Sequence, residues 1–213
     1  MSKAIIISGY LNNLSDNIIP FLDVETDLYV HTWKDNDNLR WVAKLERYKK
    51  YCNQFNLIVE EPKYNNKLHS YFYSTWRAFN SIENPETYSQ IIKFKPNLDS
   101  DRIKCKFNLN YYFNKAALQS RPLLENVKKE ECFFGSIYYK TMDERMFSGF
   151  PQSFMNFFSL KVHAFEKKML YLDKVLEDKY GINYEGSLFW MHWAENTNVP
   201  LIQDLDLIIP NNK

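Results

Sequence analysis

Short apolar runs alternate with stretches of helical spacing through the first part of the chain. Residues 4–8 form a β-branched run closed by Gly9, a pattern typical of a buried strand that ends in a turn. An amphipathic stretch follows at 13–21, and residues 26–31 alternate as a second strand. These segments predict a first βαβ unit and therefore a parallel sheet.

The same rhythm continues as far as residue 94. Apolar residues at helical spacing predict helices over 39–55 and 68–82, while short apolar runs predict strands over 57–59 and 88–94. We therefore expect an α/β fold, with a Rossmann-like, mixed but mostly parallel sheet flanked by helices. Sheets of this kind hold their ligands beyond the carboxyl ends of the strands.

The second half of the chain is less regular. Residues 132–138 predict a further strand, and 162–180 predict the longest helix, which Gly181 should end. Residues 146–158 are interpreted as a turn-rich aromatic segment. The remaining expected elements are an antiparallel strand at 103–109, a helix at 188–193 and a last strand at 205–209. A chain of 213 residues without an internal repeat predicts a single domain over 1–213.

The charge balance narrows the range of partners. Lys and Arg number 27 against 26 Asp and Glu, so the net charge of +1 creates no global field that favours nucleic acid or an anionic membrane. Aromatic residues and lysines interleave at 48–51 and 104–112, as in binders of single-stranded nucleic acid, but the net charge argues against that class. We expect no nucleic-acid partner, and any phosphate site must be local.

The N-terminal segment and the cysteines bear on localisation. The apolar run before Ser8 is too short for a signal peptide or a stable membrane span. Cys52, Cys105 and Cys132 are odd in number and lack metal-ligand spacing, which suggests reduced thiols. The expectation is a cytoplasmic protein.

The segment after the strand at 88–94 holds the chemistry expected of a metal site. Asn97 and Asp99 are two residues apart, so in extended chain their oxygen atoms point to one side and can share one Mn²⁺ or Mg²⁺ ion. Lys93 and Lys95 add positive charge that suits a diphosphate. An Asn-x-Asp triplet after a proline is also common in ordinary turns. Only the combination of this triplet with the two lysines favours a metal and diphosphate site.

Several segments match a known pattern in order along the chain. Residues 7–12 (ISGYLN) are similar to ISGHLR, residues 27–33 (DLYVHTW) to DVFIHTW, and residues 88–98 (YSQIIKFKPNL) to YDLVIRxRPDL. Near the end, 156–159 are similar to the start of DQFxFGS and 185–189 to PExLL. The chain resembles a family of small bacterial and viral glycosyltransferase-like proteins. The resemblance implies a GT-A-type fold, a divalent metal and a nucleoside-diphosphate sugar as donor.

The chain departs from this pattern at charged positions. Lys93 and Lys95 stand where the family has arginine, and lysine lacks the planar fork that clamps a phosphate from two sides. Asn97 and Asn156 stand where the family has an acidic residue. Asn97 still offers a carbonyl oxygen but no charge, which leaves Asp99 as the charged metal ligand.

Roles for the nucleotide-sugar site follow from the resemblance and from position. Ser8, Gly9 and Tyr10 are expected to hold the nucleobase, although a plain strand-end turn is equally compatible. Tyr73 and Arg77 lie four residues apart on one helical face and could reach the donor together, or else be a core tyrosine and a surface arginine. The residues that we assign to nucleotide-sugar binding are Ser8, Gly9, Tyr10, Tyr73, Arg77, Lys93, Lys95 and Asn156.

Glu185 is the candidate catalytic carboxylate. Glycosyl transfer needs a base for the acceptor hydroxyl or a carboxylate that stabilises oxocarbenium-like charge, and a glutamate at a helix start is also favoured by the dipole alone. Asp143 and Glu144, expected in a loop, are weaker candidates. His31 and Trp33 are interpreted as structural.

These expectations combine into one functional hypothesis. The sequence predicts a metal-dependent hexosyltransferase that moves a hexose from a UDP-linked donor to a glycan or another hydroxyl acceptor. The neutral Asn97 and Asn156 motivate an alternative, a nucleotide-sugar or glycan-binding module without catalysis.

Overall fold

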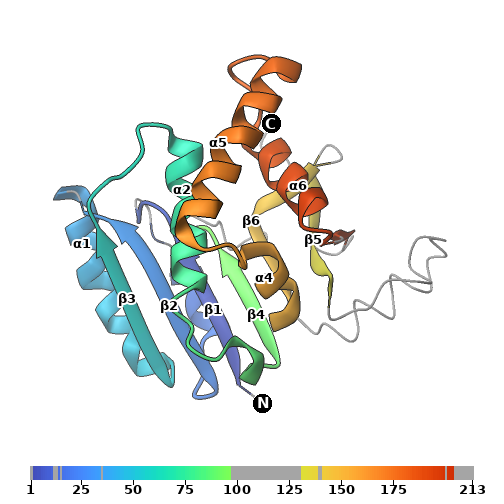
Figure 1. The fold of residues 1–213 in the computed structure, drawn as a ribbon. Coiled ribbons are helices and arrows are strands. Elements are labelled where there is room, and N and C mark those ends of the chain that lie inside the picture. The colour runs from blue at the N-terminus through green and yellow to red at the C-terminus, as the bar shows by residue number, and fades with distance from the viewer. Residues whose placement is uncertain are drawn as a thin grey trace.

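A sheet of seven strands forms the centre of the computed structural model, which describes residues 2–11, 14, 16–34, 36–96, 131–138, 141–199 and 201–203. The strand order is β3-β2-β1-β4-β6-β5-β7 (Figure 1). The strands are β1 (Lys3–Ser8), β2 (Thr26–Trp33), β3 (Gln54–Glu60), β4 (Gln90–Phe94), β5 (Phe133–Tyr138), β6 (Thr141–Gly149) and β7 (Leu201–Gln203).

The first four strands are parallel, and β6 reverses the direction. In the register, Ile7 lies between Val30 of β2 and Phe94 of β4. β6 pairs antiparallel with β4 and with β5, and β7 runs parallel to β5. The ends of β1, β2, β3 and β4 therefore meet at one edge of the sheet, which we call the carboxyl edge.

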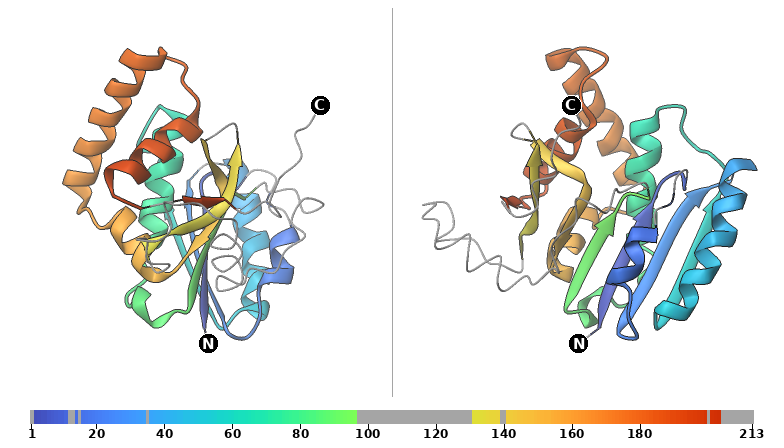
Figure 2. Two further views of the ribbon diagram at one scale, coloured as in Figure 1. Left: turned by 90° about the vertical axis from the view of Figure 1, so that its right-hand side faces the viewer. Right: turned by 180° about the vertical axis from the view of Figure 1, so that it is seen from behind.

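Helices cover both faces of this sheet. The α-helices are α1 (Asn36–Leu45), α2 (Lys67–Phe79), α4 (Pro151–Phe158), α5 (Val162–Tyr180) and α6 (Gly186–Asn196). Shorter 3₁₀ helices are η1 (Asp16–Phe21), η2 (Glu46–Tyr51) and η3 (Pro85–Thr87). Figure 2 shows α1 and η1 on one face and α2, α4, α5 and α6 on the other.

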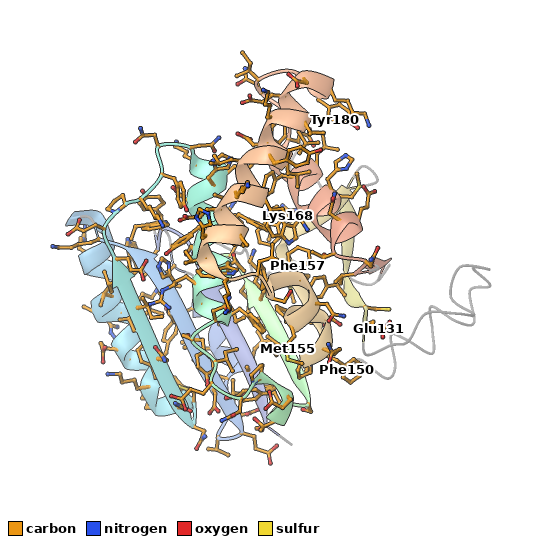
Figure 3. The ribbon with its side chains drawn as sticks, viewed as in Figure 1. Glu131, Phe150, Met155, Phe157, Lys168 and Tyr180 are labelled. Carbon is orange, nitrogen blue, oxygen red and sulfur yellow. The ribbon has the colours of Figure 1, made fainter. Side chains whose placement is uncertain are left out.

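Strand alternation separates two cores. Ala4 and Ile6 face the core beneath α2, α4, α5 and α6, whereas Ile5 and Ile7 face the core beneath α1 and η1. The first core is dominated by aromatic rings, among them Phe157 of α4, which Figure 3 labels. Trp193 of α6 donates its indole N–H to the Phe157 carbonyl at 2.8 Å, so the rings also connect through the backbone.

Most expected elements of the parallel half are confirmed, with one shortened helix. The strands predicted at 4–8, 26–31, 57–59 and 88–94 correspond to β1, β2, β3 and β4. The helix expected over 39–55 is wrong in its second half, because α1 ends at Leu45 and the chain continues as 3₁₀ helix into β3. Tyr48 of this 3₁₀ helix is still buried, so the apolar spacing alone did not reveal where α1 ends.

The second half brings further corrections. The segment at 146–158 is not turn-rich, because its first residues complete β6 and Pro151 begins α4. Asp143 and Glu144 lie inside β6 and not in a loop. The helix at 162–180 is confirmed, and Gly181 ends it with φ of 90°. The strands expected at 103–109 and 205–209 lie outside the described residues.

No helix in the described ranges combines the length and apolar character needed to cross a membrane.

Candidate functional site

The turn after β1 is bound tightly to α2. The Gly9 N–H lies 2.7 Å from the Ser74 hydroxyl and 3.2 Å from the His31 carbonyl. The Ser8 hydroxyl lies 2.7 Å from the Thr75 hydroxyl, and the Ser8 side chain is fully buried. These polar groups of the turn already form hydrogen bonds within the protein, so the turn is held in place at the carboxyl edge.

Tyr10 is the member of this predicted nucleobase turn that faces solvent. Its exposed fraction is 38%, against 0% for Ser8. An exposed tyrosine ring directly after a fixed turn offers a flat surface on which a base can stack. The structure thus separates a structural role for Ser8 and Gly9 from a solvent-exposed position for Tyr10.

Tyr71 of α2 lies where three parts of the edge meet. A Cβ atom added to Gly9 would come within 2.9 Å of the Tyr71 ring, so the ring lies against the turn after β1. The Lys93 and Lys95 ammonium groups lie 4.3 and 5.2 Å from the ring centre. The Trp190 ring of α6 lies 5.8 Å away. We call Tyr71, Lys93, Lys95 and Trp190 the Tyr71 cluster.

Lys93 is a fully buried lysine inside this cluster. Its ammonium group contacts the Tyr71 hydroxyl and lies 5.1 Å from the Trp190 ring and 5.5 Å from the Phe147 ring. Burying an ammonium group is costly unless polar or aromatic partners surround it. Lys95, two residues further along, is half-buried and is the lysine of the pair that reaches the surface.

A second polar network lies at the ends of β2 and β3. Arg77 Nε donates to Glu60 Oε1 at 2.7 Å, and the Tyr73 hydroxyl donates to Glu60 Oε2 at 3.4 Å. His31 Nε2 lies 3.4 Å from the same carboxylate oxygen. The structure therefore brings Tyr73 and Arg77 together, as the helical spacing predicts, on a carboxylate that the sequence analysis missed.

The charges in this network follow from burial and hydrogen bonding. Burial lowers the pKa of His31 to about 4, although the neighbouring Glu60 opposes the shift. Partial burial would raise the pKa of Glu60, but the Arg77 hydrogen bond and His31 hold it below its usual value. Burial, aided by the Glu60 charge, raises the pKa of Tyr73 to about 12. At neutral pH the network is a Glu60–Arg77 ion pair beside an uncharged imidazole and phenol.

Glu185 precedes α6 at an exposed position. Its carboxylate lies 3.4 Å from the Ser187 hydroxyl and makes no capping bond to the helix backbone. The adjacent Tyr184 hydroxyl contacts Asp173 of α5, whose other oxygen lies 3.2 Å from His69 Nε2 of α2. Two helices therefore anchor the segment that carries Glu185, and the same helix α6 reaches the Tyr71 cluster one turn later.

Asn156 belongs to α4 and lies apart from the Tyr71 cluster. Helix α4 begins just after Gly149, which pairs with Ile91 near the start of β4, so it enters from the opposite edge of the sheet. The Asn156 side chain accepts a hydrogen bond from Gln152 at 2.7 Å along the surface of α4. The structure thus gives Asn156 a partner on its own helix and places it outside the Tyr71 cluster.

The expected metal ligands Asn97 and Asp99 lie outside the described residues. At the last described residues before them, the Lys95 N–H donates to the Arg145 carbonyl at 2.7 Å, so β6 continues the sheet beside the carboxyl end of β4. Asp143 and Glu144 precede Arg145 on this strand and are therefore at the carboxyl edge by position. Within the described ranges, no three His, Cys, Asp or Glu side chains gather into a metal-binding group.

Comparison with known proteins identifies a similar fold but no sequence family. No family model and no curated protein matches the sequence. The glycosyltransferase GlyE of Streptococcus pneumoniae TIGR4 is similar in structure, with a TM-score of 0.53, 7% identity, and 97% of this chain but 46% of that chain covered. Its apo form gives a TM-score of 0.52 and 9% identity over the same shares. Mouse xyloside xylosyltransferase 1 gives a TM-score of 0.44 and 12% identity over 95% of this chain and 85% of that chain.

This chain spans about half the length of the GlyE chain that it resembles. At such low identity the likeness concerns the backbone arrangement alone. In this chain that arrangement consists of the strand order β3-β2-β1-β4-β6-β5-β7, the antiparallel strand β6 and the flanking helices. The protein therefore has an α/β fold with a mixed, mostly parallel sheet of the GT-A type, similar to that of glycosyltransferases.

Proposed function

We propose that the chain is a glycosyltransferase that binds a UDP-linked hexose at the carboxyl edge and transfers the hexose to a hydroxyl group of a glycan. The observation that carries this proposal is the Tyr71 cluster, which brings two lysines to the end of β4 in a GT-A-like sheet. A diphosphate requires local positive charge, and the protein as a whole supplies almost none.

In this proposal, different residues at the carboxyl edge contact the base, the diphosphate and the acceptor hydroxyl. Tyr10 offers its exposed ring to the base, because Ser8 and Gly9 have committed their polar groups to α2 and β2. Lys95 contacts the diphosphate from its half-buried position. Glu185, held beside α2 and α5 through Tyr184, acts as the base that removes a proton from the acceptor hydroxyl.

A divalent ion is part of the proposal through residues outside the described ranges. Mn²⁺ or Mg²⁺ bound by Asn97 and Asp99 would offset the charge that develops on the leaving diphosphate. By strand position Asp143 and Glu144 belong to the part of β6 beside the carboxyl end of β4, which makes them the candidates in the described chain for further ligands of such an ion.

Titration calorimetry with UDP, with and without Mn²⁺, tests binding, and release of hexose from UDP-hexoses tests turnover. We expect Mn²⁺ to strengthen UDP binding. Glu185→Gln should leave UDP affinity unchanged and lower turnover by about a hundredfold, the usual scale for loss of a general base. Glu195→Gln is the matched control, since Glu195 is an exposed glutamate at the other end of α6. Equal turnover in both variants would remove Glu185 from the mechanism.

The same measurements address the binding-module alternative, which the neutral Asn97 favours. Tight UDP or glycan binding without turnover of any donor would support a module that has lost catalysis. Salt-sensitive oligonucleotide binding together with no UDP binding would contradict both functions.

A further inference from the structure

We propose that Tyr71 is a positioning residue that sets the two lysine ammonium groups for a diphosphate. This inference rests on the proposed function and adds a residue that the sequence analysis did not select. It assigns direct phosphate contact to Lys95 and an indirect role, through Tyr71, to Lys93.

The argument starts from one ring that contacts two cations. The Lys93 and Lys95 ammonium groups lie 4.3 and 5.2 Å from the centre of the Tyr71 ring. The two ammonium groups carry like charges that repel, and the Tyr71 side chain attracts both, Lys93 also through its hydroxyl. The ring therefore holds in one place a pair of charges that would otherwise separate.

Burial divides the roles of the two lysines. Lys93 is fully buried and contacts the Tyr71 hydroxyl, and it also lies 5.1 Å from the Trp190 ring. A ligand at the surface meets the half-buried Lys95 first. Lys93 contributes its charge from beneath, through the tyrosine that covers it.

The position of Tyr71 is determined from several sides. Gly9 leaves room for the ring, because a Cβ atom there would come within 2.9 Å of it. The next turn of α2 is tied to the sheet by Ser74 and Thr75, which bond the Gly9 N–H and the Ser8 hydroxyl at 2.7 Å each. Trp190 closes the side toward α6. A ring held by three rigid elements is suited to fix the geometry of charged groups.

The test compares uridine, UMP and UDP as calorimetric ligands for the wild type, Tyr71→Leu and Tyr71→Phe. A positioning role for the lysines predicts a loss that grows with the number of phosphates. We expect the UDP dissociation constant to rise about tenfold in Tyr71→Leu and about threefold in Tyr71→Phe, which keeps the ring. Uridine affinity should stay unchanged in both.

Tyr88→Phe is the control, because its buried hydroxyl also contacts a charged group, Asp27, but lies before β4 at the other edge. It should bind all three ligands like the wild type. Equal losses for uridine and UDP, or no loss for UDP, would overturn the positioning role. If the wild type binds no UDP, the proposed function itself fails, and this is seen before any variant is compared.

If Tyr71→Leu does not fold, a double-mutant cycle tests the positioning role of Tyr71 instead. Tyr71→Phe, Lys93→Met and their combination are compared for UDP affinity, with thermal unfolding as the check on folding. We expect the double variant to bind UDP no more weakly than Lys93→Met alone, because the Tyr71 hydroxyl contacts Lys93 and acts through it. Fully additive losses would contradict the proposal.

Discussion

His31 shows how a polar residue can be read correctly from its place in a strand. The imidazole is fully buried at the end of β2, with Nδ1 2.8 Å from the Ser74 hydroxyl. A buried, hydrogen-bonded histidine at a strand end is the structural role expected from the sequence. Because burial disfavours the protonated imidazole, His31 should make the stability of the protein depend on pH.

The stability of the protein should fall as the pH falls from about 6.5 toward 4. The folded-state pKa of His31 is about 4, below the ordinary 6.5, so in this window the unfolded chain takes up a proton that the folded protein does not. The stabilisation is complete above pH 6.5 and is lost as the pH falls toward the folded pKa. The full difference amounts to about 3 kcal/mol.

Urea unfolding at a series of pH values measures this loss. His31→Asn should remove most of the dependence within the window, whereas His163→Gln, at an exposed position on α5, should keep it. A pH profile that is identical in the wild type and in His31→Asn would show that His31 is not the responsible group.

Gly9 should be less tolerant of a side chain than Gly181. Both have positive φ, at 105° and 90°, and an alanine at either position costs about 1–2 kcal/mol of backbone strain. A Cβ atom at Gly9 would also meet the Tyr71 ring at 2.9 Å, while nothing lies within 4 Å at Gly181. We expect Gly9→Ala to lower the free energy of unfolding by about 1 kcal/mol more than Gly181→Ala. Equal losses in denaturant unfolding would mean that the Tyr71 ring moves away freely.

At the scale of elements, α2 connects the site to the core. Its sequence predicted a helix over 68–82, and the structure has Lys67–Phe79 with an Asn66 cap. One side of the helix carries Tyr71, Ser74 and Thr75 toward the carboxyl edge. Another side carries Phe72 into the aromatic core, where its ring lies 4.6 Å from Trp190 and 5.4 Å from Phe165. The helical period assigns these sides, but not the elements that they contact.

Truncation of Phe72 should strongly destabilise the protein. The ring is fully buried between α4, α5 and α6, so Phe72→Ala removes contacts with all three helices at once. We expect a loss of about 3–5 kcal/mol in the free energy of unfolding. Leu170→Ala, at a position 58% exposed on α5, should change it by less than about 0.5 kcal/mol. Chemical unfolding followed by tryptophan fluorescence compares the two, and similar losses would contradict this account of the core.

At the scale of the whole molecule, the parallel half of the sheet was predictable because its inner strands β1, β2 and β4 are buried on both sides. β1 and β4 are apolar runs with clear turn signals, and their neighbouring positions follow from the βαβ rule. The carboxyl ends of the strands were predicted to form one edge in this way, and the pairing of Ile7 with Phe94 brings the ends of β1 and β4 together there. The reversal at β6 was not predicted, because an aromatic stretch at 146–158 has no clear period and its pairing partner is distant in sequence.

The sequence by itself determined the α/β class, and it predicted the carboxyl edge as the place for a ligand with Lys93 and Lys95 as its positive charge, because these follow from local period and residue type. Only the tertiary structure decided that Tyr71 joins the two lysines, that Glu60 joins Tyr73 to Arg77, and that Ser8 faces inward. Each of these contacts connects segments far apart in the chain. Such contacts depend on how the helices settle on the sheet, and no local pattern encodes that.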